Sequence, residues 1–380
     1  MKSIASFIVV IACFLLSNLL LSQTVSDSRA TKETKALFQN LWKLQTEKTI
    51  FGQQDALAYG VGWKEEKGAQ SIKSDLYLVT GEQPGIYGWD IAHLELDSSK
   101  NIDGVPFSRM KEYIREGYRR GSVITLSWHA RNPLTGGSAW DTTPGSLSSI
   151  LPGGSKHERF KLWLDKAALF LKDLKGKDGE PIPILFRPFH ELTGNWFWWC
   201  QNVCSPDEFK ACWQFTVHYL REKKGLHQLL FVYNTAQFKT EASFLERYPG
   251  DAYVDLLSFD QYQYGIDTWS SPQFVSTVQQ QLKILSSISS QRKKPQALAE
   301  TGLESVADPN WWTGSLMHAL ASYPVAYVVV WRNHGFMKST GKMHYYGPYP
   351  GQISVPDFLD FTKSPRIILE NGTRKNSLYQ

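Results

Sequence analysis

Short apolar runs alternate with amphipathic, helix-like segments along most of this chain. Each run has the length of a strand and is built around a continuous apolar stretch, which is typical of strands buried on both faces of a parallel sheet. We therefore expect an α/β fold in which a helix follows each strand. The eight runs lie at 49–52, 85–90, 123–129, 182–191, 229–236, 254–262, 295–301 and 325–332.

The segments between the runs carry helix start signals. Ser205-Pro206-Asp207-Glu208, for example, has the pattern of a capping box with proline at the first helical position. Eight strand–helix units predict one (β/α)8 barrel, with an open doubly wound sheet as the alternative. The first run lacks the glycine-rich fingerprint that such a sheet often carries, which favours the barrel. The expected helices are 107–120, 157–175, 205–224, 272–289 and one beginning near 309.

Composition excludes several classes of protein. With 42% hydrophobic and 20% charged residues in 380, the chain is not intrinsically disordered. The net charge of +5 is spread thinly and no run of five or six like charges occurs, so we expect no nucleic-acid partner. The 20 Phe, 17 Tyr and 14 Trp suit a protein that stacks on a ring-shaped ligand.

The N-terminus has the pattern of a secretory signal peptide. Lys2 precedes an apolar stretch at 4–21, and Ser22-Gln23-Thr24 is polar. We expect a signal peptide at 1–23, a barrel domain at 24–380, a periplasmic or secreted location and no stable membrane insertion after cleavage. An uncleaved anchor is the competing interpretation, and lipid attachment through Cys13 is a minor alternative.

Three further cysteines, Cys200, Cys204 and Cys212, lie close together in the sequence. A zinc site would need about four ligands, and no histidines are spaced to complete one. Core packing or one local disulfide is the expectation, and no metal or organic cofactor is implied.

Polar side chains end several of the predicted strands, and the carboxyl ends of barrel strands share one face. Glu191 and Glu300 each follow an apolar run, where an ionisable group costs desolvation energy unless it is paired. A structural salt bridge would explain either glutamate alone, but two on one face favour catalysis. The polar residues and tryptophan at strand ends are His129, His190, Glu191, Asn234, Asp260, Gln261, Tyr262, Glu300, Trp331 and Arg332.

Paired carboxylates beside aromatic side chains are typical of glycoside hydrolysis. Trp196 to Trp199 follow Glu191 closely, and four adjacent aromatics cannot all point inward. His190-Glu191 begins a zinc protease motif, but Gly194 stands where its second histidine belongs. A serine hydrolase elbow, G-x-S-x-G, is also absent from the sequence.

Two motifs resemble those of glycoside hydrolase family 26. The thirteen residues Arg187-Pro-Phe-His-Glu-Leu-Thr-Gly-Asn-Trp-Phe-Trp-Trp199 resemble its acid/base motif, and Ala299-Glu-Thr-Gly302 resembles its nucleophile motif. Matching strand ends extend the resemblance from about Gly52 to Pro356. The family consists mainly of endo-β-1,4-mannanases on (β/α)8 barrels, with catalytic glutamates after strands four and seven. The resemblance therefore implies that Glu191 is the general acid/base and Glu300 the nucleophile of a retaining reaction.

The resemblance also implies supporting roles. His190 and Tyr262 would position the nucleophile, and Trp196 would meet the sugar on the leaving side. Asp260 would fix sugar hydroxyls or Arg332. The residues implied to contact the sugar on the non-reducing side are His129, Trp331 and Arg332.

The substrate expected from this resemblance is a β-mannan, cleaved by a monomeric enzyme. Another β-glycanase activity, on β-1,3-xylan or mixed-linkage glucan, stays open because the catalytic pair does not separate them. A non-catalytic polysaccharide-binding barrel is the third alternative, although it would need neither glutamate. Two long loops, 130–155 and 333–352, follow the third and eighth strands and are able to shape the ends of a cleft.

Overall fold

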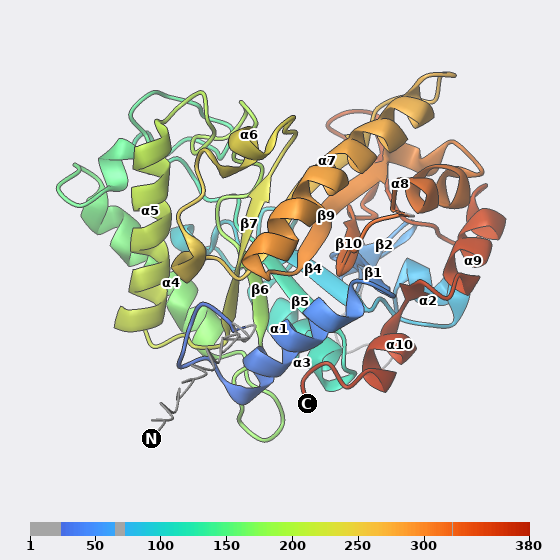
Figure 1. The fold of residues 1–380 in the computed structure, drawn as a ribbon, viewed down its shortest axis with the longest axis horizontal. Helices are drawn as coiled ribbons and strands as arrows, with labels where there is room; N and C mark the ends of the chain where they lie inside the picture. The colour runs from blue at the N-terminus through green and yellow to red at the C-terminus, as the bar shows by residue number, and fades with distance from the viewer. Residues whose placement is uncertain (1–23, 65–72, 321) are drawn as a thin grey trace, which may run out of the picture.

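Eight parallel strands close on themselves in the computed structural model, which describes residues 24–64, 73–320 and 322–380 (Figure 1). The last strand pairs with the first, Val328 opposite Phe51, so the sheet is a closed barrel rather than an open sheet. Each of the eight predicted runs overlaps one barrel strand. The strands are β1 (Thr49–Gln54), β4 (Ile86–Asp90), β5 (Val123–Ser127), β6 (Ile184–Arg187), β7 (Leu229–Thr235), β8 (Leu256–Gln263), β9 (Gln296–Leu303) and β10 (Tyr327–Val330).

Helices surround this barrel, which confirms the predicted (β/α)8 fold (Figure 1). The predicted capping box is present, because the Ser205 hydroxyl accepts from the amide of Glu208 and the Glu208 carboxylate accepts from the amide of Ser205. The α-helices are α1 (Lys32–Leu44), α2 (Asp75–Thr80), α3 (Phe107–Arg119), α4 (His157–Lys172), α5 (Pro206–His218), α6 (Glu241–Leu245), α7 (Ser270–Arg292), α8 (His318–Leu320), α9 (Val355–Lys363) and α10 (Glu370–Lys375).

Several predicted boundaries differ from the structure, and three of the differences concern where a strand ends or which kind of helix forms. The run at 182–191 is a strand only to Arg187, because Pro188 has no amide to donate to the sheet. The helix expected at 205–224 changes to π-helix over Tyr219–Lys223, and the helix expected near 309 begins as a π-helix at Trp312–Met317. Short strands outside the predicted set are β2 (Tyr59–Gly60), β3 (Trp63–Lys64), β11 (Gly335–Met337), β12 (Lys342–His344) and β13 (Ile367–Ile368).

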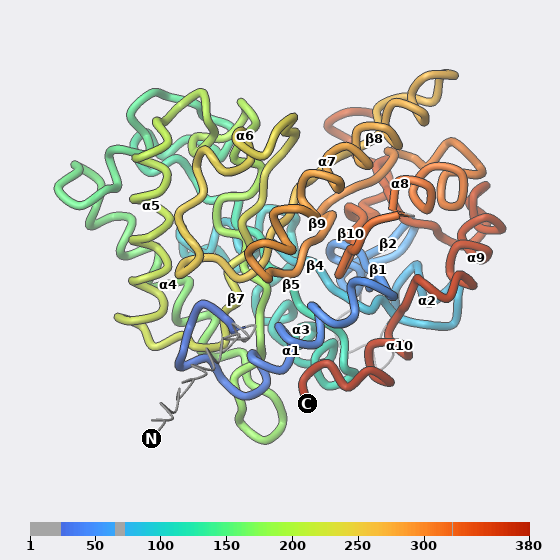
Figure 2. Tube along the Cα trace, viewed as in Figure 1, coloured from blue at the N-terminus to red at the C-terminus, as the bar shows by residue number. Residues whose placement is uncertain are grey.

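Helix α1 closes the amino-terminal end of the barrel. Its side chains Leu37, Phe38 and Leu41 are fully buried and belong to the same apolar cluster as the inward residues of the strands, such as Leu230. The C-terminal residues lie beside α1, where Asn40 donates a hydrogen bond to the carbonyl of Leu378 (Figure 2). With this end closed, the carboxyl ends of the strands remain as the face where a ligand can enter.

Strand β9 contains a bulge one residue before Glu300. Leu298 lies opposite Phe259, but Glu300 lies opposite the next residue, Asp260, so Ala299 is an extra residue. Ala299 belongs to the interior cluster, and regular alternation would point Glu300 outward to the helices. Because of the bulge, Glu300 also points to the inside, where it meets Arg187.

The three cysteines of the barrel domain are buried and unbridged, so of the two expectations the structure shows core packing. Burial raises the pKa of the Cys200 thiol to about 12 and that of Cys204 to about 11. We expect slow reaction with Ellman's reagent in the native protein and three titratable thiols per mature chain after unfolding. A count of one thiol in the unfolded, unreduced chain would instead indicate a disulfide.

The predicted targeting segment, 1–23 with Cys13, lies outside the described residues. Among the helices of the described chain, none is long and apolar enough to cross a membrane.

Candidate active site

Glu191 lies in the turn that follows β6, at the open end of the barrel. Its backbone is left-handed, with φ of 55°, which is a strained conformation for a residue other than glycine. The Glu191 amide is fixed by a 2.8 Å hydrogen bond to the side-chain oxygen of Asn234. The Trp196 indole donates a 2.6 Å hydrogen bond to the Glu191 carboxylate. These contacts hold the carboxyl group over the barrel mouth.

The environment of Glu191 favours its protonated form. Burial of the carboxyl group, followed by the negative charge of Glu300, raises the pKa of Glu191 to about 7. The Trp196 hydrogen bond opposes this rise, because it stabilises the ionised form. Glu191 can therefore hold a proton near neutral pH and release it when the neighbouring charge disappears.

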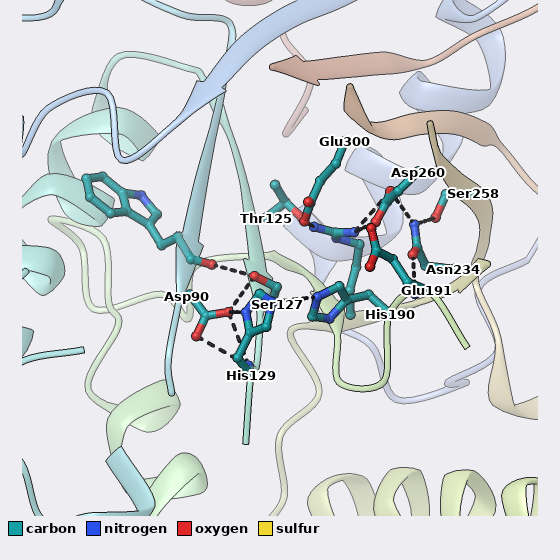
Figure 3. A network of polar contacts seen from close by, with 12 residues as sticks. Asp90, Thr125, Ser127, His129, His190, Glu191, Asn234, Ser258, Asp260 and Glu300 are labelled. Atoms are coloured by element: carbon teal, nitrogen blue, oxygen red, sulfur yellow. Dashed lines mark hydrogen bonds and ion pairs between the residues drawn. The ribbon is translucent and has the colours of Figure 1, made fainter. Parts of the chain in front are cut away.

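Glu300 is held by two donors. The buried guanidinium of Arg187 pairs with one carboxylate oxygen of Glu300, and the Tyr262 hydroxyl donates to the other over 3.1 Å. Arg187 also pairs with Asp260 at 3.0 Å, and Asp260 accepts a 2.8 Å bond from the Asn234 amide (Figure 3). One buried cation is thus shared by the carboxyl groups of Glu300 and Asp260.

The carboxyl groups of Glu191 and Glu300 converge (Figure 3). One oxygen atom each of Glu191, Glu300 and Asp260 lies within 4.8 Å of the others. Such a set of oxygens could attract a cation, but Arg187 already supplies positive charge to two of the three carboxylates. The structure therefore brings together the two glutamates that the sequence placed at separate strand ends.

His129 and His190 form a second polar chain beside the glutamates (Figure 3). The Nδ1 of His129 lies 2.7 Å from the buried Asp90 carboxylate, and its Nε2 lies 3.1 Å from the Nε2 of His190. Burial alone would lower the pKa of His129, but the charge and hydrogen bond of Asp90, together with the charges of Glu300 and Asp103, raise that pKa above its usual value. Burial and the charge of His129 lower the pKa of His190 well below its usual range. When His129 is protonated, it can donate to both Asp90 and neutral His190.

Aromatic rings form the walls of the site. Trp196 is exposed while Phe197, Trp198 and Trp199 are buried, so one of the four adjacent aromatics faces outward as expected. Trp140, from the loop after β5, stacks on His129 with ring centroids 5.2 Å apart. Trp331 is half-buried and meets the edge of the same histidine at 6.4 Å.

A pocket of about 410 Å³ opens beside Glu191. Its walls include Trp196, Asp260, Tyr262 and Tyr264, together with the polar side chain of Gln237. The pocket is therefore bordered by both the Glu191 side chain and the exposed Trp196 ring.

Arg332 does not contact Asp260, so that part of the expectation is wrong. The Arg332 guanidinium pairs with buried Asp103 at 2.6 Å, while Asp260 pairs with Arg187.

The sequence alone did not indicate the roles of Asp90, Asp103 and Arg187. Arg187 is the first residue of the motif at 187–199, and Asp90 is the last residue of the second apolar run. Their partners lie on strands distant in the sequence, so spacing along the chain does not reveal them.

Comparisons with known proteins find relatives that share the sequence and the fold of this chain. Residues 26–295 match the profile of glycosyl hydrolase family 26. A mannan endo-1,4-beta-mannosidase from Bifidobacterium adolescentis is 31% identical over 93% of this chain, which spans only 38% of that protein's length. A GH26 β-mannanase from Bacteroides ovatus, BoMan26A, is 42% identical, with a TM-score of 0.86 over 92% of this chain and 98% of that structure. GH26C from a Muricauda species is 32% identical, with a TM-score of 0.82 over 94% and 96%.

Proposed function

Because the chain belongs to glycosyl hydrolase family 26, we propose that it hydrolyses β-1,4-mannosidic bonds in mannan, glucomannan or galactomannan with retention of configuration. The observation that carries this proposal is the convergence of Glu191, whose pKa is raised to about 7, and arginine-paired Glu300. The similarity to mannan endo-1,4-beta-mannosidases and to the B. ovatus β-mannanase supports the substrate class.

The carboxyl separation supports the retaining mechanism. Oxygen atoms of Glu191 and Glu300 lie within 4.8 Å. Retaining glycosidases place their carboxyl groups about 5–5.5 Å apart, whereas inverting enzymes need about 6.5–9.5 Å to admit a water molecule. The shorter spacing leaves room for one anomeric carbon between the two groups.

In the first step, Glu300 attacks the anomeric carbon while the bond to the leaving oxygen breaks. Glu191 gives its proton to that oxygen. The negative charge of Glu300 is lost in the new ester bond, so Glu191 then ionises more readily. In the second step Glu191 takes a proton from water, and the resulting hydroxide displaces Glu300 and restores its charge.

Neighbouring side chains support these steps. The Tyr262 hydroxyl and the Arg187 guanidinium, both bound to Glu300, orient the attacking oxygen. Trp196 lies beside Glu191, where its exposed ring can stack on the sugar that leaves. His129, held by Asp90, with Trp331 and Arg332 would contact the sugar on the non-reducing side.

A product assay tests the proposal and separates its alternatives. We expect reducing sugars from β-mannan, and NMR of the first products should show retained anomeric configuration. Release only from β-1,3-xylan or mixed-linkage glucan would reassign the substrate. Binding without release from any of these glycans would instead indicate a carbohydrate-binding barrel.

The pH dependence of kcat/KM should reflect Glu191. Glu191 must be protonated to act as the acid, so activity should fall as the pH rises through about 7. In Trp196→Phe the ionised carboxylate loses a hydrogen-bond donor, so this alkaline limb should move to higher pH. Trp140→Phe, whose ring stacks on His129, is the matched control and should keep the limb in place. A limb unchanged or moved to lower pH in Trp196→Phe would contradict the assignment.

We also propose that the domain at 24–380 acts as a monomer in the periplasm or the medium, after removal of segment 1–23. The apolar stretch at 4–21 with its polar exit supports export. Comparison of the N-terminal sequence of the exported protein with the encoded one tests both the cleavage and the alternative of lipid attachment at Cys13.

A further inference from the structure

The loop between β8 and α7 exposes three large apolar side chains that the mechanism does not use. Tyr264 is 82% exposed, Ile266 60% and Trp269 78%. Tyr264 and Trp269 are the two most exposed large apolar side chains of the described chain. We call these three side chains the 264–269 ridge. Apolar groups gathered in solvent within six residues are typical of a binding surface.

The backbone of this loop is nevertheless well held. At its start, the buried Gln263 side chain donates to the carbonyl of Gly265 over 3.1 Å. At its end, the Asp267 carboxylate accepts from the amides of Trp269 and Ser270, both at 2.9 Å. Because the backbone is already ordered, a ligand that covers the ridge would lose less entropy on binding than one that had to order the loop.

The ridge is continuous with the candidate active site. Tyr264 lines the same pocket as Glu191 and Trp196. Glu191 protonates the leaving oxygen in the proposed mechanism, so this pocket receives the part of the substrate on the reducing-end side. The loop precedes α7 and lies at the carboxyl-end side of the barrel, where the chain reaches the upper right of Figure 1.

We propose that the 264–269 ridge binds further sugar units of the polysaccharide on the reducing-end side of the cleaved bond. This inference rests on the proposed function, because it extends the same cleft. A flat indole or phenol ring can cover the C–H face of a sugar, and the ridge presents two such rings beyond Trp196. The ridge would thus favour long substrates over those that end in the pocket beside Glu191.

The test compares a long substrate with a short one. The long substrates are mannohexaose and linear β-mannan, and the short one is an aryl β-mannobioside whose leaving group ends in the pocket. For Trp269→Ala and Tyr264→Ala we expect kcat/KM on the long substrates to fall about threefold to tenfold, mainly through KM. For Trp269→Ala the loss should be confined to the long substrates, whereas Tyr264→Ala should also affect the short one, because Tyr264 lines the pocket that receives its leaving group. Leu169→Ala, which removes a 70% exposed side chain on the outer face of α4, is the matched control.

The outcomes separate this inference from the proposed function. Equal kcat/KM values for wild type and Trp269→Ala on mannohexaose would overturn the inference and leave mannan hydrolysis intact. Equal losses of Trp269→Ala on short and long substrates, in a variant whose thermal unfolding matches the wild type, would also overturn it. If the wild type cleaves another β-glycan and not mannan, the proposed substrate is wrong. The same variants, assayed on long and short forms of that glycan, then show whether the ridge binds sugar units. If the wild type were a dimer, and Trp269→Ala were monomeric with unchanged kinetics, the ridge would be a self-association surface instead.

Discussion

Replacing Glu300 with alanine should abolish turnover of both polysaccharide and activated aryl glycosides, by on the order of 10⁴-fold or more. Without this carboxylate no group forms the covalent intermediate, whatever the leaving group. Alanine also leaves Arg187 with Asp260 as its remaining carboxylate partner. Initial rates on mannan and on an aryl β-mannobioside measure the effect.

The Glu191→Ala variant should respond differently to the two substrates. A mannosyl leaving group needs a proton, whereas an activated phenol leaves without one. We therefore expect a large loss on mannan and a much smaller loss in the first step on the aryl glycoside. Glu304→Ala removes a nearby carboxylate that pairs with His344 and should stay close to wild type on both. Equal modest losses in the Glu191 and Glu300 variants would contradict the assigned roles.

Arg187→Met should lower the free energy of unfolding by about 3–5 kcal/mol at neutral pH. The substitution keeps much of the side-chain length but leaves Asp260 and Glu300 as buried carboxylates without their shared cation. Urea unfolding at pH 7 measures the loss. At lower pH the two carboxyl groups can take up protons in the variant, so the deficit relative to wild type should shrink.

Two matched variants make the Arg187 test specific. Arg187→Lys keeps the charge but loses the fork that reaches both carboxylates, so its destabilisation should be intermediate. Arg119→Met breaks an exposed pair with Glu116 and should change the free energy of unfolding by about 0–1 kcal/mol. If Arg187→Met were no more destabilised than Arg119→Met, the compensating role of Arg187 would be wrong.

The barrel was predictable because its strands are buried on both faces. The run at 229–236 begins with five consecutive apolar or aromatic residues and does not alternate with polar ones, so its length and spacing indicate β7 directly. Helix α1 was not predicted as the closure of the barrel, although it is amphipathic, because a periodic apolar face does not say which surface covers it. The strand expected over 182–191 was too long because the apolar pattern continues past Pro188 into the turn.

Site residues that lie at strand ends could be predicted from the sequence. Contacts between side chains from different strands could not. Glu191 and Glu300 were expected on one face because the carboxyl ends of all strands share it. The bond from Asp90 to His129 and the pairing of Arg332 with Asp103 join different strands and loops, and spacing along the chain does not encode them. The expected contact between Asp260 and Arg332 is absent for this reason. Arg187 reaches Asp260 across the barrel interior instead.

The extra residue in β9 has a consequence for enzyme engineering. The extra residue reverses the side of the strand to which the following side chains point. Glu300 faces inward only because Ala299 is inserted before it. In a regular strand, a glutamate placed directly after an inward residue, as Glu300 follows Ala299, would point to the outer helices. A successful transplant has to carry the irregular backbone of 298–300 together with the acid.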